Sequence, residues 1–285
     1  MLTCTFLNNW GARRQQVLFD YIERQAGTNT IMAFTEVNHT FGLPVDMPIN
    51  TFGEDGPVMV NQFGQLQELL SGRYTGVFAA ENSDTYWCMQ TGLTVPDVQY
   101  GNALFIANTV QYVADGIQYI VGEFGARTED GPNSRVLQYI VCAVNGERYL
   151  IAHFHGIWIR GNTKGDAAER ITQSARVLDI LDRLAVEFKT AKVILGGDFN
   201  LDINTMALKM LERGSAAGNL KYRNLIREYG ISDTRSPDHY RHYDDDPQPS
   251  LYADYVLVSE AVTVVNFVAD ETDVSDHRPL EVTFY

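Results

Sequence analysis

The segment VILGGDFNLD, which runs from Val193 to Asp202, places several chemically useful side chains directly after an apolar run. Two glycines end the run, and Asp198, Asn200 and Asp202 follow them. A carboxylate can orient or deprotonate a water molecule, and an amide can stabilise negative charge that develops during a reaction. For Asp202 we favour a different role, the cap of the helix that follows. The pattern predicts a strand that delivers Asp198 and Asn200 to a reactive site at the edge of a sheet.

Several other expected strands also carry polar, reactive residues at one end. Functional groups on the strand ends and adjoining loops of a rigid sheet are a common arrangement for catalysis. Each residue alone has an ordinary structural explanation, such as a turn for Asn8 or an exposed strand end for Glu36. Their recurrence indicates a shared site. The residues concerned are Asn8, Glu36, His155, Asp254, Asp276 and His277.

Asp254 is difficult to explain as a surface residue. In the expected strand DYVLVS it alternates with Val256 and Val258, so the three side chains share one face. A carboxylate on an apolar face is costly to bury unless it has a partner. His277, in the segment SDHRP, is a candidate for that partner.

His153 and His155 lie two residues apart in an expected strand, so they point to the same side. A His-x-His pair can belong to a zinc site, but HFHGIW lacks the aspartate and third histidine of the metallo-β-lactamase-like motif. We therefore expect one histidine to be catalytic and the other to be a packed neighbour. Oxygen ligands from Glu, Asp and Asn favour Mg²⁺, with Mn²⁺ as a substitute, over zinc.

Short strands with scattered helices are the elements that must position these residues. The Asn145-Gly146 pair between two alternating apolar segments predicts a hairpin. No internal repeat or linker divides the chain, so we expect one domain, residues 1–285, with two packed sheets and helices outside them. Strands are expected at 2–9, 30–37, 73–80, 102–109, 117–124, 135–144, 148–155, 192–197, 254–259 and 279–285. Helices are expected at 13–25, 65–72, 166–188, 206–212 and 222–229.

Composition narrows the classes of function. The formal net charge of −14 argues against a protein that holds nucleic acid mainly by neutralising phosphates, although a nuclease with a metal in its cleft remains compatible. No apolar run approaches the roughly 18 residues of a membrane span. Because no leader segment is recognisable and Cys4, Cys88 and Cys142 read as reduced core thiols, we expect a cytoplasmic protein. We assume a monomer.

The motifs together resemble the endonuclease/exonuclease/phosphatase family, which includes deoxyribonuclease I, exonuclease III, sphingomyelinases and inositol polyphosphate 5-phosphatases. Asn8, TEV around Glu36, HG at His155, GGDFN, ADYV and SDHRP occur in the family's order and cover almost the whole chain. GDFN followed by SDHxP is the specific part of the pattern. The resemblance implies an α+β fold, a four-layer αββα sandwich of two packed mixed β-sheets flanked by helices.

The resemblance also implies roles for matching residues in metal binding. Glu36 resembles the family's metal-binding glutamate, and Asp276 resembles the acidic residue that joins the metal shell. Asn8 looks like the asparagine partner, although the neighbouring Asn9 leaves an ambiguity of one residue.

Further matches imply roles in phosphoester hydrolysis. Asp198 and Asn200 look like the pair that positions the attacking water and stabilises the phosphorane. His277 is similar to the histidine that contacts the scissile phosphate, and Asp254 to the carboxylate that orients a catalytic histidine. We therefore expect an Asp254–His277 hydrogen bond that favours the imidazolium. Two further matches are His155, the histidine of the deoxyribonuclease and phosphatase branches, and Arg135, a phosphate-contacting arginine.

The leading functional prediction is a Mg²⁺-dependent phosphodiesterase that acts on nucleic acid or a nucleotide-like diester by in-line attack of water. FLNNWGAR, GDFNLDIN and YADYV depart from the motifs of abasic-site endonucleases, and LYADYV lacks the extended 5-phosphatase motif. The alternative is a phosphomonoesterase on a small metabolite or lipid headgroup, which fits the charge at least as well. A catalytically dead binding module is disfavoured because every key position is occupied. Substrate choice is expected to depend on loops 40–61, 81–99 and 240–251.

Overall fold

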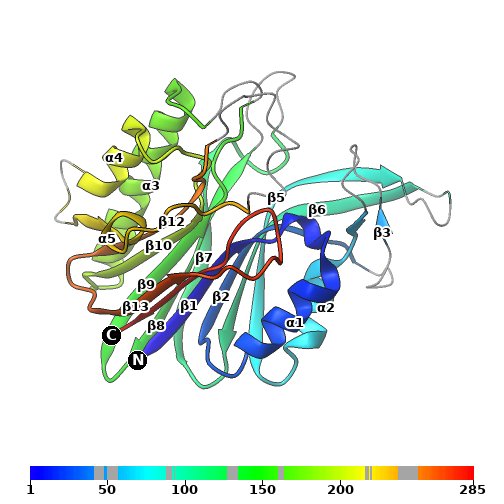
Figure 1. Cartoon of the computed structure of the whole chain (residues 1–285), viewed down its shortest axis with the longest axis horizontal. Helices are drawn as coiled ribbons and strands as arrows, with labels where there is room; N and C mark the ends of the chain where they lie inside the picture. Colours follow the sequence, from blue (N-terminus) through cyan, green and yellow to red (C-terminus); the bar gives the residue numbers. More distant parts are fainter. Residues whose placement is uncertain are drawn as a thin grey trace.

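Two six-stranded mixed sheets form the body of the protein (Figure 1). The computed structural model describes residues 1–285 except 42–47, 50–56, 88–91, 93, 127–133, 160–163, 216–217, 219 and 237–249. The first sheet has the order β13 (Val264–Ala269), β14 (Leu280–Phe284), β1 (Leu2–Asn8), β2 (Ile31–His39), β6 (Thr94–Ala107) and β5 (Tyr74–Trp87). The second has the order β11 (Tyr222–Asn224), β12 (Asp254–Ser259), β10 (Lys192–Asp198), β9 (Glu147–Phe154), β8 (Arg135–Val144) and β7 (Gln111–Val121).

Helices cover the outer faces of both sheets, which gives the expected four-layer αββα sandwich (Figure 1). The helices are α1 (Gln15–Gln25), α2 (Gln62–Leu69), α3 (Ala168–Glu187), α4 (Met206–Arg213) and α5 (Leu225–Glu228), with a 3₁₀ turn, η1 (Trp10–Ala12), before α1. In β2, Ile31 and Ala33 join the core between the sheets, whereas Met32 and Phe34 pack in the cluster that includes α1 and α2. This is the period-two alternation of a strand that is buried on both faces.

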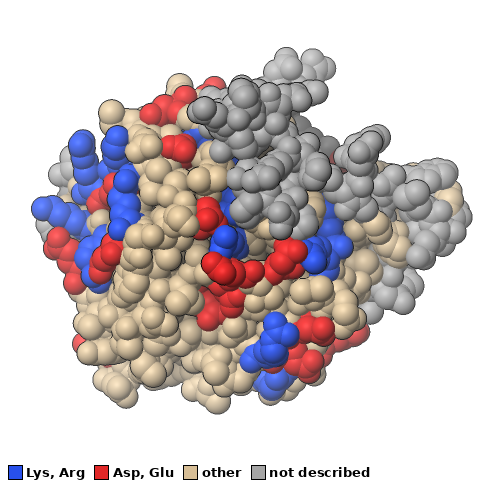
Figure 2. Space-filling view, viewed as in Figure 1, with Lys and Arg blue, Asp and Glu red and all other residues tan. Residues whose placement is uncertain are grey.

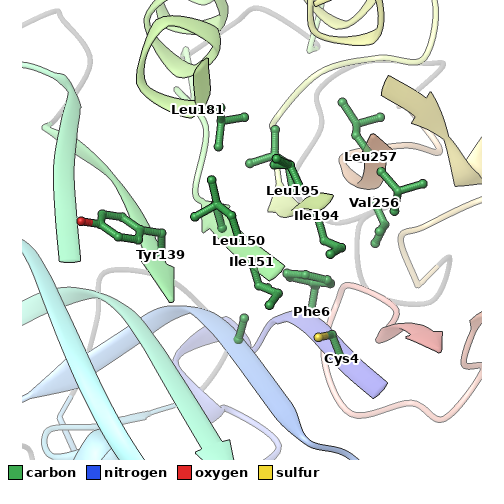
Figure 3. Packing of buried hydrophobic residues seen from close by; sticks show 14 of the residues in the cluster. Cys4, Phe6, Tyr139, Leu150, Ile151, Leu181, Ile194, Leu195, Val256 and Leu257 are labelled. Carbon is green, nitrogen blue, oxygen red and sulfur yellow. The ribbon is translucent and has the colours of Figure 1, made fainter. Parts of the chain in front are cut away.

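The two sheets approach closely where Phe6 of β1 meets β10. Figure 3 shows Phe6 beside Ile151 and Ile194, with Leu181 of α3 on the far side of the second sheet. A Cβ atom at Gly196 would lie 2.5 Å from the Phe6 ring, so only glycine fits there. The first glycine of the GGDFN motif is therefore explained by packing.

Most of the predicted elements are present. The Asn145-Gly146 hairpin has positive φ at both residues, 52° and 82°, as a tight two-residue turn requires. Cys4 and Cys142 are buried free thiols, and Cys88 lies outside the described residues. No helix in the described part of the chain is long and apolar enough to cross a membrane.

The course of β2 differs from the prediction that Glu36 ends the strand. The strand continues to His39, and its pairing with β6 shifts register between Phe34 and Val37. Glu36 lies at this irregularity with φ 59°. A bulge turns a side chain out of the regular alternation, so Glu36 leaves the strand's face without ending the strand.

The predicted helix at 222–229 is wrong in its first half. Residues Tyr222–Asn224 form β11, and only Leu225–Glu228 are helical. β13 was not expected, and the predicted loop 40–61 contains the short pair β3 (Pro48–Ile49) and β4 (Val58–Met59). Residues 237–249 of the predicted loop 240–251 lie outside the described residues.

Asp202 is not the N-cap of α4. That position belongs to Thr205, whose side chain accepts a hydrogen bond from the Leu208 amide. Asp166 accepts from the first two amides of the helix, those of Met206 and Ala207. Asp202 instead accepts from the amide of Asn204, in a turn before the helix.

Candidate active site

A pocket with a volume of about 390 Å³ lies at the end of β10, beside the segments that follow β1 and β9. Seven of the nine residues predicted for the site line it, and Asn8 and Asp254 are hydrogen-bonded to lining residues. The lining residues are Trp10, Arg13, Glu36, Tyr100, Arg135, His155, Trp158, Lys164, Asp198, Asn200, Arg235, Asp276 and His277.

Asn8 joins the two carboxylates at the base of the pocket. Its Nδ2 donates to Glu36 Oε1 and to Asp198 Oδ2, each at 3.0 Å, and its Oδ1 accepts from the Trp10 amide. The neighbouring Asn9 points away from the pocket. In the side-chain orientation that satisfies both amide atoms, its nitrogen donates to the backbone carbonyls of Thr35 and Glu36. The geometry therefore assigns the contact with Glu36 to Asn8.

Asp198 and Asn200 face the pocket because Phe199, between them, is buried in the core. The Phe199 ring stacks on Phe154 with 4.5 Å between centroids and is fully buried. Gly197, within β10, has φ 120°, which residues with a side chain rarely adopt, and Asn200 itself has φ 52°. The backbone amide of Asn200 then donates to Asp198 Oδ1 at 2.8 Å. The D-F-N order thus anchors the middle residue and presents the outer two.

Asp198 stays ionised in this arrangement. Burial alone would raise its pKa, but His277, His155, Lys164 and the Asn8 amide together hold the pKa well below its usual range. A carboxylate with such a low pKa is a weak base. Its strength lies in accepting hydrogen bonds and in orienting a donor such as water.

His277 forms the expected hydrogen bond with Asp254, at 2.6 Å between Nδ1 and Oδ2. Burial would lower the pKa of His277, but the carboxylates of Asp254, Asp276 and Asp198 outweigh it and raise the pKa to about 9. Burial also raises the pKa of Asp254, so the two partners compete for one proton. We assign the proton to His277, because two further carboxylates act on its ring. Its Nε2 lies 3.8 Å from Asp198 Oδ2.

His155 lies in the same pocket but is neutral. Burial, with Arg135, His277 and Lys164 nearby, lowers its pKa to about 3 against the opposing effect of Asp198. The Tyr100 hydroxyl is 3.3 Å from Nδ1, and burial keeps the pKa of that hydroxyl far above neutral. The hydroxyl therefore donates to Nδ1, which leaves the proton of His155 on Nε2.

His153 is the packed neighbour of the pair. It is fully buried, and its Nε2 is 2.8 Å from Gln138 Oε1. Burial lowers its pKa to about 3. It does not line the pocket.

Arg135 forms an ion pair with the buried carboxylate of Glu81, a residue that was not predicted from the sequence. Nη1 donates to Glu81 Oε2 at 2.8 Å, and Nε donates to the Gly156 carbonyl at 3.1 Å. The same carbonyl accepts from Asn200 Nδ2 at 3.2 Å. With Nε and Nη1 engaged, Nη2 is the nitrogen that has no hydrogen-bond partner among the described residues. Arg135 is thus pre-oriented toward the pocket.

Comparison with known proteins identifies the family. The sequence profile of the Endonuclease/Exonuclease/phosphatase family matches residues 8–277. The chain belongs to this family. It is therefore a phosphoesterase, an enzyme that hydrolyses phosphoester bonds. No curated protein matches the sequence.

Solved structures of this family share the fold. A mannosyl-6-phosphatase from Bacteroides thetaiotaomicron is 14% identical with a TM-score of 0.65, and the alignment covers 100% of both chains. The human Nocturnin catalytic domain with bound sulfate is 19% identical with a TM-score of 0.62, over 100% of this chain and 93% of that one. TDP2 from D. rerio, complexed with single-strand DNA product, is 14% identical with a TM-score of 0.63, over 100% and 98%.

The family generally depends on a divalent metal, and the acidic residues of the pocket fit one. Glu36 and Asp276 both line the pocket. Burial raises the pKa of Glu36, and repulsion from Asp276 and Asp198 raises it further against the effects of Asn8 and His277. A hard divalent cation would relieve this repulsion, and the donor set is the oxygen set that Mg²⁺ prefers.

Asn8 and the group of Asp198, Asp254 and His277 are less suited to bind the metal than Glu36 and Asp276 are. Asn8 presents Nδ2 to Glu36, so in this structure it steadies the carboxylate, and its predicted role as an oxygen ligand stays a prediction. Potential ligand atoms of Asp198, Asp254 and His277 also lie within 4.8 Å of one another. In that group the short Asp254–His277 hydrogen bond already uses Nδ1, which favours a hydrogen-bonded pair over a metal centre.

Six lining residues were not foreseen from the sequence: Trp10, Arg13, Tyr100, Trp158, Lys164 and Arg235. Lys164 Nζ donates to Asn200 Oδ1 at 2.9 Å, although its Gly-, Asn- and Asp-containing segment is typical of a solvated loop. Arg235 is buried and pairs through its backbone with His277. Only contacts across the fold show that these residues belong to the site.

Proposed function

We propose that this phosphoesterase is a Mg²⁺-dependent phosphodiesterase that cleaves its substrate by in-line attack of water. The observation that carries the proposal is the position of Asp198. Its carboxylate is ionised and lies beside the Asn200 amide and the two histidines, with Nε2 of His155 at 3.6 Å and Nε2 of His277 at 3.8 Å. A water held by Asp198 would face a phosphorus atom bound between these groups.

The chain's own residues would stabilise the charge that builds on the phosphate. His277, as an imidazolium held by Asp254, donates from Nε2 to a non-bridging oxygen. Asn200 and the Nη2 group of Arg135 add donors on the neighbouring side. Asp276 and Glu36, the latter steadied by Asn8, would hold Mg²⁺, which supplies Lewis-acid stabilisation of phosphate charge when bound. His155, with its proton on Nε2, is a neutral donor toward the same centre.

A small diester fits the molecule better than a long nucleic acid. The net charge is −14, and the face in Figure 2 carries basic side chains in small groups beside acidic ones, with no continuous basic stripe among its coloured atoms. A long polyanion would be repelled at distance. The structure of TDP2 complexed with single-strand DNA product is a precedent for a nucleotide-like ligand on this fold.

Phosphomonoester hydrolysis is the second candidate, and one observation favours it. The pocket gathers Arg13, Arg135, Lys164 and Arg235 around three carboxylates, which suits a substrate with more than one negative charge. The mannosyl-6-phosphatase of the same fold is a precedent for a monoester substrate.

A substrate panel distinguishes the two candidates. We expect bis-p-nitrophenyl phosphate and dinucleotides to be cleaved faster than p-nitrophenyl phosphate, in Mg²⁺ or Mn²⁺, and EDTA to abolish both activities. Plasmid DNA and RNA should be poor substrates. If p-nitrophenyl phosphate is cleaved faster than every diester, the monoesterase candidate replaces the leading one.

Replacement of Glu36 by Gln tests the metal site. The variant keeps the shape of the side chain but removes its charge, so the apparent Mg²⁺ requirement should rise and turnover at fixed Mg²⁺ should fall by about 10- to 100-fold. The exposed Glu187→Gln on α3 serves as the matched control and should behave as wild type. Full Mg²⁺-dependent turnover in Glu36→Gln would show that the metal is held elsewhere.

A further inference from the structure

Lys164 occupies a place in the pocket that an ordinary loop lysine does not reach. Only 8% of the residue is exposed, and its Nζ donates to Asn200 Oδ1 at 2.9 Å. Lysine is rarely buried to this extent, because its charge must be taken out of water. The ammonium therefore stands beside a predicted catalytic residue, within the lining of the cavity.

The backbone at Lys164 is in the left-handed region, with φ 55°. Four of the eight non-glycine residues with positive φ in the described part of the chain line this pocket: Trp10, Glu36, Lys164 and Asn200. Glycine would adopt this conformation at lower cost than lysine. The exposed Lys189 has a similar φ, so the backbone conformation supports a role for Lys164 only together with its burial and its contact with Asn200.

Two hydrogen bonds hold the backbone of Lys164 and Gly165. The Lys164 carbonyl accepts from the Asp202 amide at 2.8 Å, and the next carbonyl, of Gly165, accepts from Nη1 of Arg170. Arg170 is fully buried, and its Nε also donates to the Ile157 carbonyl, two residues after His155. Lys164 is thus held in position relative to His155 and Asn200, as a catalytic group must be.

We propose that Lys164 is a catalytic residue that binds a non-bridging oxygen of the substrate phosphate. The inference rests on the proposed phosphoester hydrolysis in this pocket. In the free protein the ammonium holds the Asn200 amide, which directs Nδ2 toward Gly156. In the reaction a water oxygen bonds to phosphorus, the bond from phosphorus to the leaving oxygen breaks, and a proton released by the attacking water reaches the leaving oxygen through solvent. Lys164 stays protonated throughout and stabilises the charge on the phosphate oxygen.

A second left-handed lysine provides a matched control. Lys189, at φ 50°, is exposed, lies just after α3, and does not line the pocket. Lys164→Gly and Lys189→Gly relieve the same backbone strain, so both should melt within a few degrees of wild type. Lys164→Gly should lower kcat/KM on bis-p-nitrophenyl phosphate by about 10²-fold, the scale of one lost transition-state donor. Lys189→Gly should keep wild-type turnover, and Lys164→Arg should recover at least part of the loss.

Calorimetry with inorganic phosphate in Mg²⁺ adds a readout that does not need turnover. Lys164→Gly should weaken phosphate binding by about 10- to 100-fold, as expected for a lost charged hydrogen bond, and Lys189→Gly should not. If the wild type hydrolyses no phosphoester but Lys164→Gly still loses phosphate binding, the contact stands and the proposed function fails. Turnover and phosphate binding at wild-type level in Lys164→Gly would overturn the inference. A wild type that neither hydrolyses phosphoesters nor binds phosphate overturns both.

Discussion

His277 and His155 approach the same oxygen of Asp198 with the same ring nitrogen, at 3.8 and 3.6 Å, yet their surroundings give them opposite charges. His277 is backed by Asp254, and carboxylates raise its pKa to about 9 against the effect of burial. His155 is backed by the Tyr100 hydroxyl, and burial lowers its pKa to about 3. One pocket thus contains an imidazolium and a neutral imidazole at neutral pH.

The difference shows that a directly hydrogen-bonded carboxylate decides the charge of a buried histidine in this pocket. The Asp254 carboxylate fixes a proton on Nδ1 of His277 and favours the charged ring. At His155, burial and the nearby cations favour the neutral ring, and the Tyr100 hydroxyl selects the tautomer. Two charged rings would repel each other and would compete for Asp198. With one of each, the site can place a cation on one side of a phosphate and a neutral Nε2–H donor on the other.

Asp254→Asn should have the largest effect of the substitutions that alter this contrast. Turnover should fall by on the order of 10²-fold, because the imidazole of His277 loses both its orientation and its charge. The raised pKa keeps the imidazolium until the pH passes through it, so removing the carboxylate should move the alkaline limb of the pH–rate profile to lower pH. The profile is measured for wild type and variant at the same Mg²⁺ concentration.

Asp179→Asn is the control for this change, because Asp179 is exposed on α3 and pairs with Arg183. It should leave both turnover and the profile unchanged. An Asp254→Asn protein with wild-type turnover and an unmoved alkaline limb would mean that Asp254 is structural.

Tyr100→Phe should have a smaller effect. The change removes the donor to Nδ1 of His155 and leaves the tautomer unfixed, so turnover should fall by about 2- to 10-fold, the size of one net hydrogen bond. The alkaline limb set by His277 should stay in place. Tyr119→Phe removes a comparable bond, to the Ala80 carbonyl, outside the pocket and should be silent in the kinetic assay. A Tyr100→Phe loss as large as that of Asp254→Asn would mean that the two histidines are equally dependent on their partners.

His153→Gln should leave turnover unchanged within about twofold, which is below the effect of one net hydrogen bond. The effect should appear in stability at low pH instead. The pKa of His153 is lowered to about 3, so between its ordinary value and pH 3 the unfolded chain binds a proton that the folded chain does not. Wild-type stability therefore falls as pH decreases through this range, and the variant should show a shallower fall in urea denaturation. A large loss of turnover would assign His153 to the site.

The clustering of most candidate site residues in one pocket could be predicted from the sequence, because they lie at strand ends and in spaced motifs. Asp254 is an example: alternation with two valines placed it on an apolar face, and it is indeed buried and paired with His277. The sandwich itself was predictable for the same reason, since short apolar strands alternate with few helices.

The environments of those residues could not be predicted in the same way. Tyr100 reaches His155 from the other sheet, and Glu81 reaches Arg135 from β5, across 54 residues of sequence. Lys164 lies in a segment that local pattern assigns to solvent. Glu36 was mistaken for a strand end because a bulge leaves no signal in residue type. Contacts of this kind depend on how two sheets meet.

An NMR titration of the imidazole resonances in metal-free protein measures the charge of each histidine directly. We expect His277 to be protonated at neutral pH and to titrate with a pKa raised to about 9, while His155 remains neutral, with its proton on Nε2, down to a pKa of about 3. Two histidines that titrate together near the ordinary pKa of about 6.5, or a protonated His155 beside a neutral His277, would contradict this expectation.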